Sequence, residues 1–514
     1  MKINWKAISA VVLLTNPGLA AEEKDQPAKY KPSWSSLYAH EAAPEWFQDA
    51  KFGIYFHWGV YSVPAFGSEW YPRWMHFEGN PMYEHHRRTY GDVNEFGYHD
   101  FVPMFKAENF DPEAWADLFD QAGAKFAGPV AEHHDGFSMW DSEITPWNAA
   151  DMGPKRDITG EIAEAIRKRD MKLVTTFHHA RNLQRPWLPE VDTMFSDEGR
   201  LHWNSHFPPF DFMPTTSNDP KLQMLYGNMP EGPWYDFMWK GKVIEVIDKY
   251  QPDMIWFDVW LDWIPDRIQA ETYAHYLNEA RKWGKDVTIV CKHLDIPREV
   301  AIEDFEKGRL DKLVDYSWLT DDTISKGSWC YTEGLKIKPT AQVFHSLIDI
   351  VSKNGVLLLN ISPKADGTIP EDQQKVLKEM GAWLKAYGES IYETRTWTVY
   401  GEGPTTFEMG KRGAHMIKEN PYKAEDIRFT RSKDGKTLYL ITMGWPGEGG
   451  TLTSKTLPQE LPEGTKVESV SMLGGQGNLS FEMGDEAFTL TVSGAKPASA
   501  DLATVFKLSL GSGE

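Results

Sequence analysis

Apolar runs of strand length alternate with amphipathic segments of helical period over the first two thirds of the chain. The predicted strands are residues 52–57, 125–132, 173–177, 254–258, 287–292, 313–317 and 356–361. The predicted helices between them are residues 112–122, 159–169, 242–250, 268–283 and 340–352. Repeated strand–helix–strand order favours a parallel sheet, and seven or so strands over this length fit a (β/α)₈-like TIM barrel with long loops. One strand of the eight is missing or irregular in this pattern.

Residues 182–239 interrupt the alternation. The segment is rich in Pro, Trp and Phe and has little periodicity. A stretch of this length is too long for an ordinary barrel loop, so we expect it to build part of an active-site wall.

The pattern changes again after Tyr387, where short alternating runs are separated by Gly-rich turns. The runs are residues 394–399, 427–431, 437–443, 466–472, 479–483, 487–492 and 504–509. They predict an antiparallel β-sandwich. We therefore expect a barrel domain over residues 35–385 and a sandwich domain over residues 390–514. No ionisable cluster lies in the second region, so packing against the barrel is its expected role, with carbohydrate binding as the less favoured alternative.

Composition and charge narrow the class of protein. The chain has 514 residues, 41% of them hydrophobic and 13% aromatic, which is enough for a large core and two domains. Its formal net charge of -21 argues against nucleic acid and anionic membrane as partners.

The first 21 residues have the pattern of a signal peptide. Lys2 and Lys6 form a basic start, an apolar core follows, and small residues around Ala20 and Ala21 form a cleavage site. We expect an exported protein in the periplasm or outside the cell. Cys291 and Cys330 are the two cysteines of the chain, and one disulfide or two buried thiols both fit this reading.

Ionisable residues follow the ends of three predicted strands. His57 ends the first, His133 and His134 follow the second and lead into a glycine turn, and Asp258 ends the fourth. Active sites of TIM barrels lie at this end of the strands. Trp58, Trp70, Trp140 and Trp256 accompany these residues, and aromatic rings suit the C–H faces and hydroxyls of a sugar.

Four segments resemble successive blocks of glycoside hydrolase family 29, the α-L-fucosidases. They are residues 46–70, residues 132–137 (Glu132-His-His-Asp-Gly-Phe137), residues 250–258 and residues 351–370. The resemblance extends over roughly residues 35–385. It implies hydrolysis of terminal α-L-fucose with retained configuration through a covalent glycosyl-enzyme, on a fucosylated oligosaccharide or polysaccharide, without cofactor or metal.

The same resemblance implies roles for single residues. Asp258 matches the nucleophile. His57, Glu69, His133, His134 and Trp256 would hold the fucose hydroxyls, with Trp70 near the pocket. A retaining enzyme also needs a proton donor about 5 to 5.5 Å from the nucleophile.

The position of the proton donor is less well defined. We expect it at Glu306, with Glu303 and Asp304 as neighbouring rivals. Lys292 and His293 stand where many family members have an arginine that contacts the sugar. Residues 177–179, Phe-His-His, stand where they commonly have a tyrosine-rich strand end, so a different or modified sugar is a further hypothesis.

Three alternatives remain open. An α-L-galactosidase would differ only in meeting the C6 hydroxyl of L-galactose. A metal-dependent barrel hydrolase would use the strand-end histidines as zinc ligands, although its usual His-x-His after the first strand is absent, since His57-Trp58-Gly59 offers one imidazole. A catalytically inactive sugar-binding protein would need an altered carboxylate, whereas Asp258 is present.

Overall fold

The computed structural model describes residues 28–185, 205–208, 219–405, 422–475, 479–494 and 496–512. The signal-peptide prediction and much of the 182–239 segment lie outside these ranges. None of the helices within them is long and apolar enough to cross a membrane.

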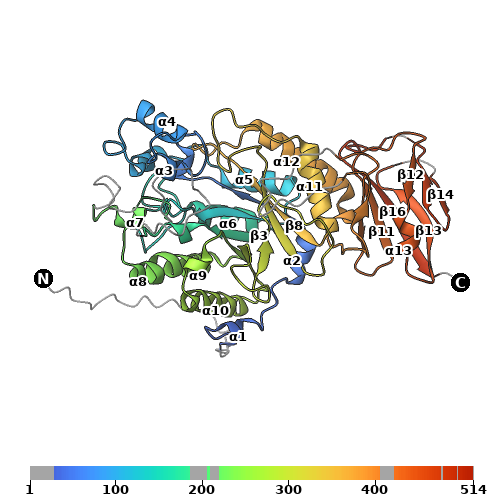
Figure 1. Ribbon diagram of the computed structural model, residues 1–514, viewed down its shortest axis with the longest axis horizontal. Helices are drawn as coiled ribbons and strands as arrows, with labels where there is room; N and C mark the ends of the chain where they lie inside the picture. Colours follow the sequence, from blue (N-terminus) through green and yellow to red (C-terminus); the bar gives the residue numbers. More distant parts are fainter. Residues whose placement is uncertain are drawn as a thin grey trace, which may run out of the picture.

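Eight parallel strands form a closed barrel, which confirms the predicted fold class. The strands are β1 (Phe52–Phe56), β2 (Phe126–Glu132), β3 (Lys172–Phe177), β4 (Met254–Phe257), β5 (Thr288–Lys292), β6 (Ile302–Asp304), β7 (Trp318–Thr323) and β8 (Gly355–Ile361). They follow one another in chain order around the barrel, and β8 pairs with β1 to close it. Figure 1 shows the strands at the centre of the larger domain with helices packed around them.

The α-helices are α1 (Trp34–Leu37), α2 (Glu45–Ala50), α3 (Tyr71–Trp74), α4 (Pro81–Thr89), α5 (Pro112–Gln121), α6 (Ile158–Arg167), α7 (Gln223–Tyr226), α8 (Glu231–Pro233), α9 (Lys242–Tyr250), α10 (Asp266–Lys282), α11 (Thr340–Ser352), α12 (Glu371–Tyr387) and α13 (Thr456–Glu460). Within the described residues, the 3₁₀ and π segments are η1 (Val60–Ser62), η2 (Tyr98–Met104), η3 (His179–Arg181), η5 (Trp234–Gly241), η6 (Leu261–Trp263) and η7 (Gly388–Ser390). The five predicted helices are confirmed as α5, α6, α9, α10 and α11, with ends that differ by at most two residues.

The predicted barrel strand at residues 313–317 is wrong. The structure has two strands in this part of the barrel, β6 and β7. Residues 313–317 form an irregular, partly exposed segment, and β7 begins at Trp318 instead. β6 is three residues long and two of them are acidic. A search for apolar runs fails for β6 and β7 because both carry carboxylates that face the interior of the barrel.

Two layers of side chains fill the barrel domain. Inward-facing residues of the strands, among them Tyr55, Trp256 and Leu358, make an interior cluster. Residues of the opposite strand face, such as Ile54, pack against the surrounding helices. This alternation follows from the two-residue period of a strand. It places inward-facing polar groups at the barrel mouth.

The C-terminal region consists of two antiparallel sheets, as predicted. The strands are β9 (Gly401–Glu402), β10 (Ile427–Arg431), β11 (Thr437–Thr442), β12 (Thr451–Ser454), β13 (Thr465–Met472), β14 (Ser480–Met483), β15 (Phe488–Thr491) and β16 (Thr504–Ser512). The sheets have the orders β13-β16-β11-β10-β9 and β12-β15-β14, and one apolar cluster joins them. The predicted strand 394–399 is wrong, since this segment makes a single bridge at Arg395. The short β12 was not expected, because it adjoins the Gly-rich turn at 447–450.

The sandwich packs on α11 and α12, as Figure 1 shows. Arg428 of β10 donates to Asp349 of α11 at 2.7 Å with both side chains buried, and Trp383 of α12 donates to the carbonyl of Ala503 at 2.9 Å. These contacts support the expected packing role.

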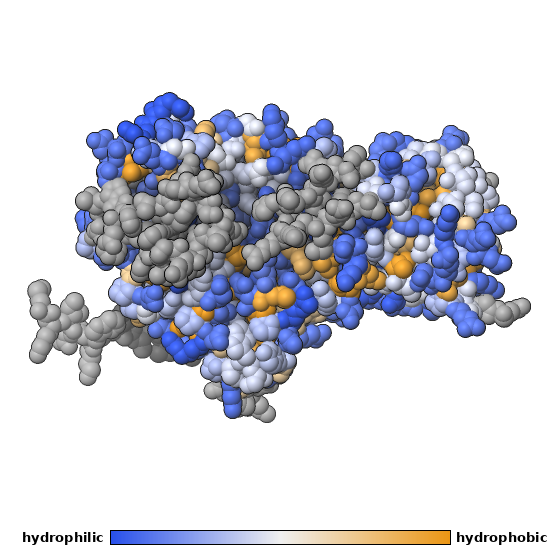
Figure 2. Space-filling view, in the orientation of Figure 1, coloured by the Kyte–Doolittle hydropathy of each residue, from blue (hydrophilic) through white to orange (hydrophobic). Residues whose placement is uncertain are grey.

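Cys291 and Cys330 are both buried free thiols, which decides between the two alternatives for the cysteines. The surface in Figure 2 is dominated by hydrophilic residues, with small separated hydrophobic areas.

Candidate active site

Ionisable side chains gather at the carboxyl ends of six neighbouring strands. They are His57 after β1, His133 and His134 after β2, His178 after β3, Asp258 after β4, Lys292 at the end of β5 and Glu306 after β6. All except Glu306 are at least nine-tenths buried. The predicted residues on β1, β2 and β4 therefore meet at one point.

Asp258 is held from three sides. Its Oδ2 lies 3.3 Å from His134 Nε2 and 3.2 Å from His178 Nδ1, and its Oδ1 lies 3.0 Å from Lys292 Nζ. Burial by itself would raise the pKa of this carboxyl, but the charge of Lys292 and the contacts with the two histidines outweigh it and hold the pKa well below its ordinary value. Asp258 is therefore an oriented, ionised carboxylate.

Lys292 joins the acidic groups of the site. Its Nζ also lies 3.4 Å from Glu306 Oε2 and 3.5 Å from Asp321 Oδ2. Asp258 Oδ1 and Glu306 Oε2 contact the same nitrogen. They can therefore be no farther apart than the sum of their distances to Lys292 Nζ, which are 3.0 Å and 3.4 Å. Burial would lower the pKa of Lys292, but the surrounding carboxylates raise it well above its ordinary value. Lys292 therefore stays charged between the two carboxyl groups.

The two rivals of Glu306 have other partners. Asp304 is fully buried and accepts a hydrogen bond from Trp256 Nε1 at 2.6 Å and another from the main-chain N–H of Asp321 at 3.0 Å. Glu303 pairs with Arg298, whose Nε donates to it at 3.0 Å. Of these three acidic residues, Glu306 makes the ion pair with the lysine that contacts Asp258. Its side chain is 18% exposed.

His57 and His133 lie beside this centre. His57 Nδ1 donates to Asn360 Oδ1 at 2.8 Å, and the main-chain N–H of His57 donates to the same oxygen at 2.9 Å. The rings of His57 and His133 are 5.5 Å apart, and His178 lies 5.1 Å and 4.9 Å from them. Burial lowers the pKa of all three imidazoles. They are neutral at physiological pH.

Glu69, Trp70 and Trp256 complete the predicted set. Glu69 is buried and accepts from the main-chain N–H of Trp329 at 3.1 Å and the hydroxyl of Ser328 at 3.2 Å. Trp70 lies 5.2 Å from the ring of His134. Trp256 lies 4.9 Å from the ring of His178 and 5.0 Å from Lys292 Nζ. Trp70 and Trp256 thus contact the cluster directly, and Glu69 is anchored to the loop that follows β7.

The turn after β2 is held by contacts with neighbouring elements. Glu132, the last residue of β2, makes a buried ion pair with Lys242 of α9 at 2.7 Å. Gly136 has a φ of 79°, and a Cβ there would lie 2.5 Å from the carbonyl oxygen of Leu225. A glycine is therefore required three residues after His133.

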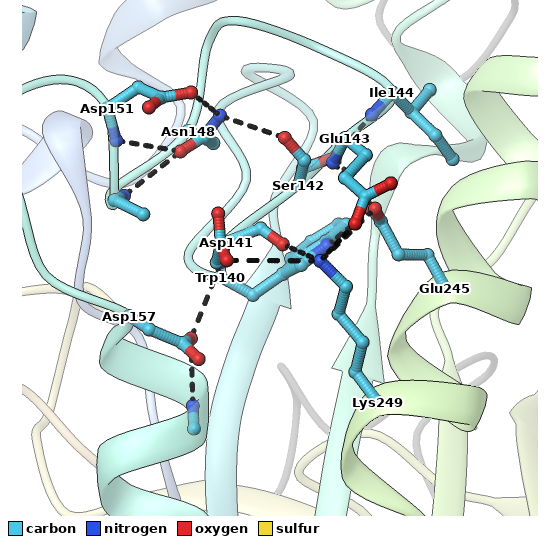
Figure 3. Close-up of polar contacts among 12 residues, drawn as sticks. Trp140, Asp141, Ser142, Glu143, Ile144, Asn148, Asp151, Asp157, Glu245 and Lys249 are labelled. Carbon is cyan, nitrogen blue, oxygen red and sulfur yellow. Dashed lines mark hydrogen bonds and ion pairs between the residues drawn. The ribbon is translucent and has the colours of Figure 1, made fainter. Parts of the chain in front are cut away.

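Figure 3 shows how the following loop is fixed to the same helix. Glu245 of α9 accepts from Trp140 Nε1 at 2.7 Å, from the hydroxyl of Ser142 at 2.7 Å and from the main-chain N–H of Glu143 at 2.6 Å. Lys249, one turn further on, donates to the carbonyl of Asp141 at 2.5 Å. Both ends of the β2 loop are thus anchored, which fixes the positions of His133 and His134.

Sequence reasoning missed several residues of the site. In the sequence His178 stands out only as a departure from the family pattern, and Asn360 and Asp321 are not among the predicted site residues. Asn360 follows Leu357-Leu358-Leu359 within β8, so the strand-end signal that indicated Asp258 could also have found it. Trp329 lies 5.3 Å from the ring of His57 but comes from a loop without periodicity, so no signal pointed to it.

The histidines are also spaced closely enough to hold a metal ion. His57, His133 and His178 form one group, and His134, His178 and Asp258 form another, each with one ligand atom per residue within 4.8 Å of the others. The donors fit Zn²⁺ or a related ion.

The chain is similar to α-L-fucosidases over most of its length. The family model described as alpha-L-fucosidase matches residues 18–389. Tissue alpha-L-fucosidase of Rattus norvegicus is 30% identical over 500 residues, which are 94% of this chain and 92% of the relative. The solved structure of Thermotoga maritima alpha-fucosidase in complex with fucose has a TM-score of 0.69 at 29% identity, and covers 93% of this chain and 100% of its own. The same enzyme in complex with a mechanism-based inhibitor has a TM-score of 0.70 at 28% identity, with coverage of 93% and 100%.

Proposed function

The chain belongs to the α-L-fucosidase family, glycoside hydrolase family 29, and acts as a retaining α-L-fucosidase through a covalent intermediate; on this basis we propose that Asp258 is its nucleophile and Glu306 its acid/base. The observation that carries this assignment is the shared contact of both carboxyl groups with Lys292 Nζ, at 3.0 Å and 3.4 Å.

The environment of Asp258 suits a nucleophile. Its low pKa keeps the carboxylate ionised, and the hydrogen bond from His178 Nδ1 and the ion pair with Lys292 orient it. In the first step Asp258 forms a bond to C1 of the fucosyl ring as the bond from C1 to the leaving oxygen breaks. Glu306 gives its proton to that oxygen. In the second step Glu306 takes a proton from water, the water oxygen bonds to C1, and the Asp258 ester breaks.

The environment of Glu306 suits proton transfer. Its side chain is 18% exposed, against 10% for Asp258, so water can reach it for the second step. One oxygen of Asp258 and one of Glu306 lie 3.0 Å and 3.4 Å from Lys292 Nζ, which limits how far apart the two carboxyl groups can be. This limit is compatible with the separation of about 5 to 5.5 Å between the carboxyl groups of retaining enzymes.

We assign the fucose hydroxyls to His57, His133, His134 and Glu69, and the apolar face of the sugar to the ring of Trp256, whose Nε1 donates to Asp304. His57 donates its Nδ1–H to Asn360, so its Nε2 is left as an acceptor for a sugar hydroxyl. His133 Nδ1 is buried and has no hydrogen-bond partner among the described residues, so a substrate hydroxyl would satisfy it. Trp70 extends the aromatic wall beside His134.

The natural substrate we propose is a fucosylated oligosaccharide or polysaccharide met outside the cytoplasm, in keeping with the pattern of residues 1–21. An α-L-galactosidase is the second candidate within the family, because L-galactose differs from L-fucose by one hydroxyl at C6.

An activity panel tests the assignment of sugar and residues together. Chromogenic α-L-fucoside, α-L-galactoside and β-D-galactoside are assayed with the wild-type enzyme, and early product is followed by NMR. We expect the α-L-fucoside to be cleaved fastest and the α-anomer to be released first, because attack by Asp258 and then by water inverts C1 twice. Release of β-L-fucose first would contradict Asp258 as nucleophile, and faster cleavage of the galactoside would replace the fucosidase by the second candidate.

A further inference from the structure

The imidazoles of His57, His133 and His178 form a compact triad at the ends of three consecutive strands. One ring nitrogen of each lies within 4.8 Å of the others, and the three residues are 3%, 3% and 2% exposed. Three histidines converging on one point are a frequent ligand set for Zn²⁺, with a fourth position left for water or another ligand.

Neighbouring hydrogen bonds fix the tautomers of two members. His57 donates its Nδ1–H to Asn360 Oδ1 at 2.8 Å, and His178 donates its Nδ1–H to Asp258 Oδ2 at 3.2 Å. In both rings the lone pair is therefore on Nε2. This is the arrangement that orients metal-binding histidines in proteins, in which the second ring nitrogen donates to a carbonyl or a carboxylate. The Nε2 of His178 accepts from the hydroxyl of Thr176 at 3.3 Å, a contact that a bound metal ion would replace.

Charge around the triad favours a cation. Asp258, Glu306 and Asp321 all lie within 3.5 Å of Lys292 Nζ, so three carboxyl groups gather beside the triad around one lysine. Asp258 also joins His134 and His178 in the second group of potential ligands, so an ion at the triad would lie next to a carboxylate.

We propose that the triad His57–His133–His178 binds one transition-metal ion such as Zn²⁺ or Cu²⁺, and that this ion inhibits the enzyme by excluding the sugar. The inhibitory part rests on the proposed function, which assigns two of these imidazoles to fucose hydroxyls, whereas binding of the ion does not. Cu²⁺ should bind more tightly than Zn²⁺, and Mg²⁺ and Ca²⁺ should not compete, because imidazole is a poor ligand for hard cations.

His178 makes this a property of the present chain. It stands at the strand end where the family resemblance led us to expect tyrosine. A phenol at this position would leave two imidazoles and no triad. The zinc ion that the metal-dependent alternative would use as a cofactor is therefore proposed to inhibit this enzyme.

Direct binding tests the site without use of the activity. Tag-free protein freed of metal is titrated with Zn²⁺ by calorimetry, and with Co²⁺ by visible absorption. We expect one Zn²⁺ per chain and a Co²⁺ spectrum of low coordination number. His133→Gln and His178→Gln should each raise the Kd for Zn²⁺ about ten-fold or more. The matched control is His275→Gln, an imidazole on α10 that pairs with Asp248 at 2.6 Å and belongs to neither group of potential ligands, and it should keep the wild-type Kd.

The outcomes separate the two parts of the proposal. Unchanged Zn²⁺ binding in both triad variants, at wild-type thermal stability, would overturn the site, and so would an equal loss of Zn²⁺ binding in His275→Gln.

If the triad binds Zn²⁺, the ion should act as a competitive inhibitor of aryl α-L-fucoside hydrolysis. L-fucose should then weaken Zn²⁺ binding, and a chelator should restore full activity. Tight triad-dependent binding without competition would refute the shared site alone. Loss of activity in the chelator would refute the inhibitory role and support a metal cofactor.

Discussion

Replacing Lys292 by methionine removes the positive charge that neutralises the carboxylates of the site. At 3.0 Å and an effective dielectric constant of about 20, the Lys292–Asp258 pair attracts by about 5 kcal/mol before burial costs are counted. Removing one partner of a buried ion pair destabilises a protein by about 3–5 kcal/mol, because the other charge is left unpaired. Over a barrel of this size that corresponds to a fall of about 5 °C in Tm.

The same change alters the pH dependence of catalysis. With Lys292 present, the low pKa of Asp258 keeps the nucleophile ionised, and its contribution to stability is present above the ordinary carboxyl pKa and lost as the pH falls through the lowered value. Without Lys292, burial dominates and raises that pKa. The acid limb of kcat/KM should therefore move to higher pH in Lys292→Met.

Profiles of kcat/KM against pH, together with thermal melts, measure both effects. Lys292→Arg is the matched control, since it keeps the charge and should keep most of the wild-type acid limb. A Lys292→Met enzyme with the wild-type acid limb and the wild-type Tm would refute the electrostatic account of the site.

Three further substitutions test the assigned roles. Asp258→Gly should abolish turnover of every α-L-fucoside, and added azide should yield β-L-fucosyl azide; residual hydrolysis at the wild-type rate would exclude Asp258. Glu306→Ala should lower kcat/KM about 10²- to 10⁴-fold for fucosyl oligosaccharides and much less for aryl fucosides with acidic phenols, with azide giving α-L-fucosyl azide; equal losses on both substrates would move the acid/base elsewhere. His133→Ala and His134→Ala should each lower kcat/KM about 10²-fold at unchanged Tm, because a buried sugar hydroxyl left unpaired costs about 1–3 kcal/mol; near wild-type kinetics would remove both from the pocket.

The strand-end rule could predict much of this site from the sequence. His57, His133, His134 and Asp258 each close an apolar run, and parallel strands bring their carboxyl ends to one rim. Asn360 obeys the same rule, but its amide is uncharged and so does not stand out as a catalytic group in the sequence.

The choice among the acidic residues after β5 could not be made from spacing. Which of Glu303, Asp304 and Glu306 faces Asp258 depends on how β6 pairs with its neighbours, and β6 itself has no apolar run to reveal it. The pairing turns Asp304 into the barrel, where the indole of Trp256 donates to it, and leaves Glu306 beyond the strand end next to Lys292. The direction in which each acidic side chain points is therefore set by tertiary contacts between strands.

Turns and alternating apolar residues predicted the sandwich. The errors among its predicted strands also arise because strand pairing depends on tertiary contacts. Residues 394–399 have a strand pattern, but only Arg395 finds a partner, across from Arg431. β12 was missed because four residues beside a glycine turn give little signal, although Leu452 and Ser454 alternate with exposed threonines as a half-buried strand should.

The central claim is that Asp258 attacks the sugar with Glu306 as its partner, and isolation of the covalent intermediate tests it most directly. Glu306→Ala is mixed with an activated aryl α-L-fucoside, or the wild type with 2-deoxy-2-fluoro-α-L-fucosyl fluoride, then quenched, digested and sequenced by tandem mass spectrometry. We expect one fucosyl ester, on Asp258. A label on Asp304, Asp321 or Glu303, or inactivation without any label, would contradict it.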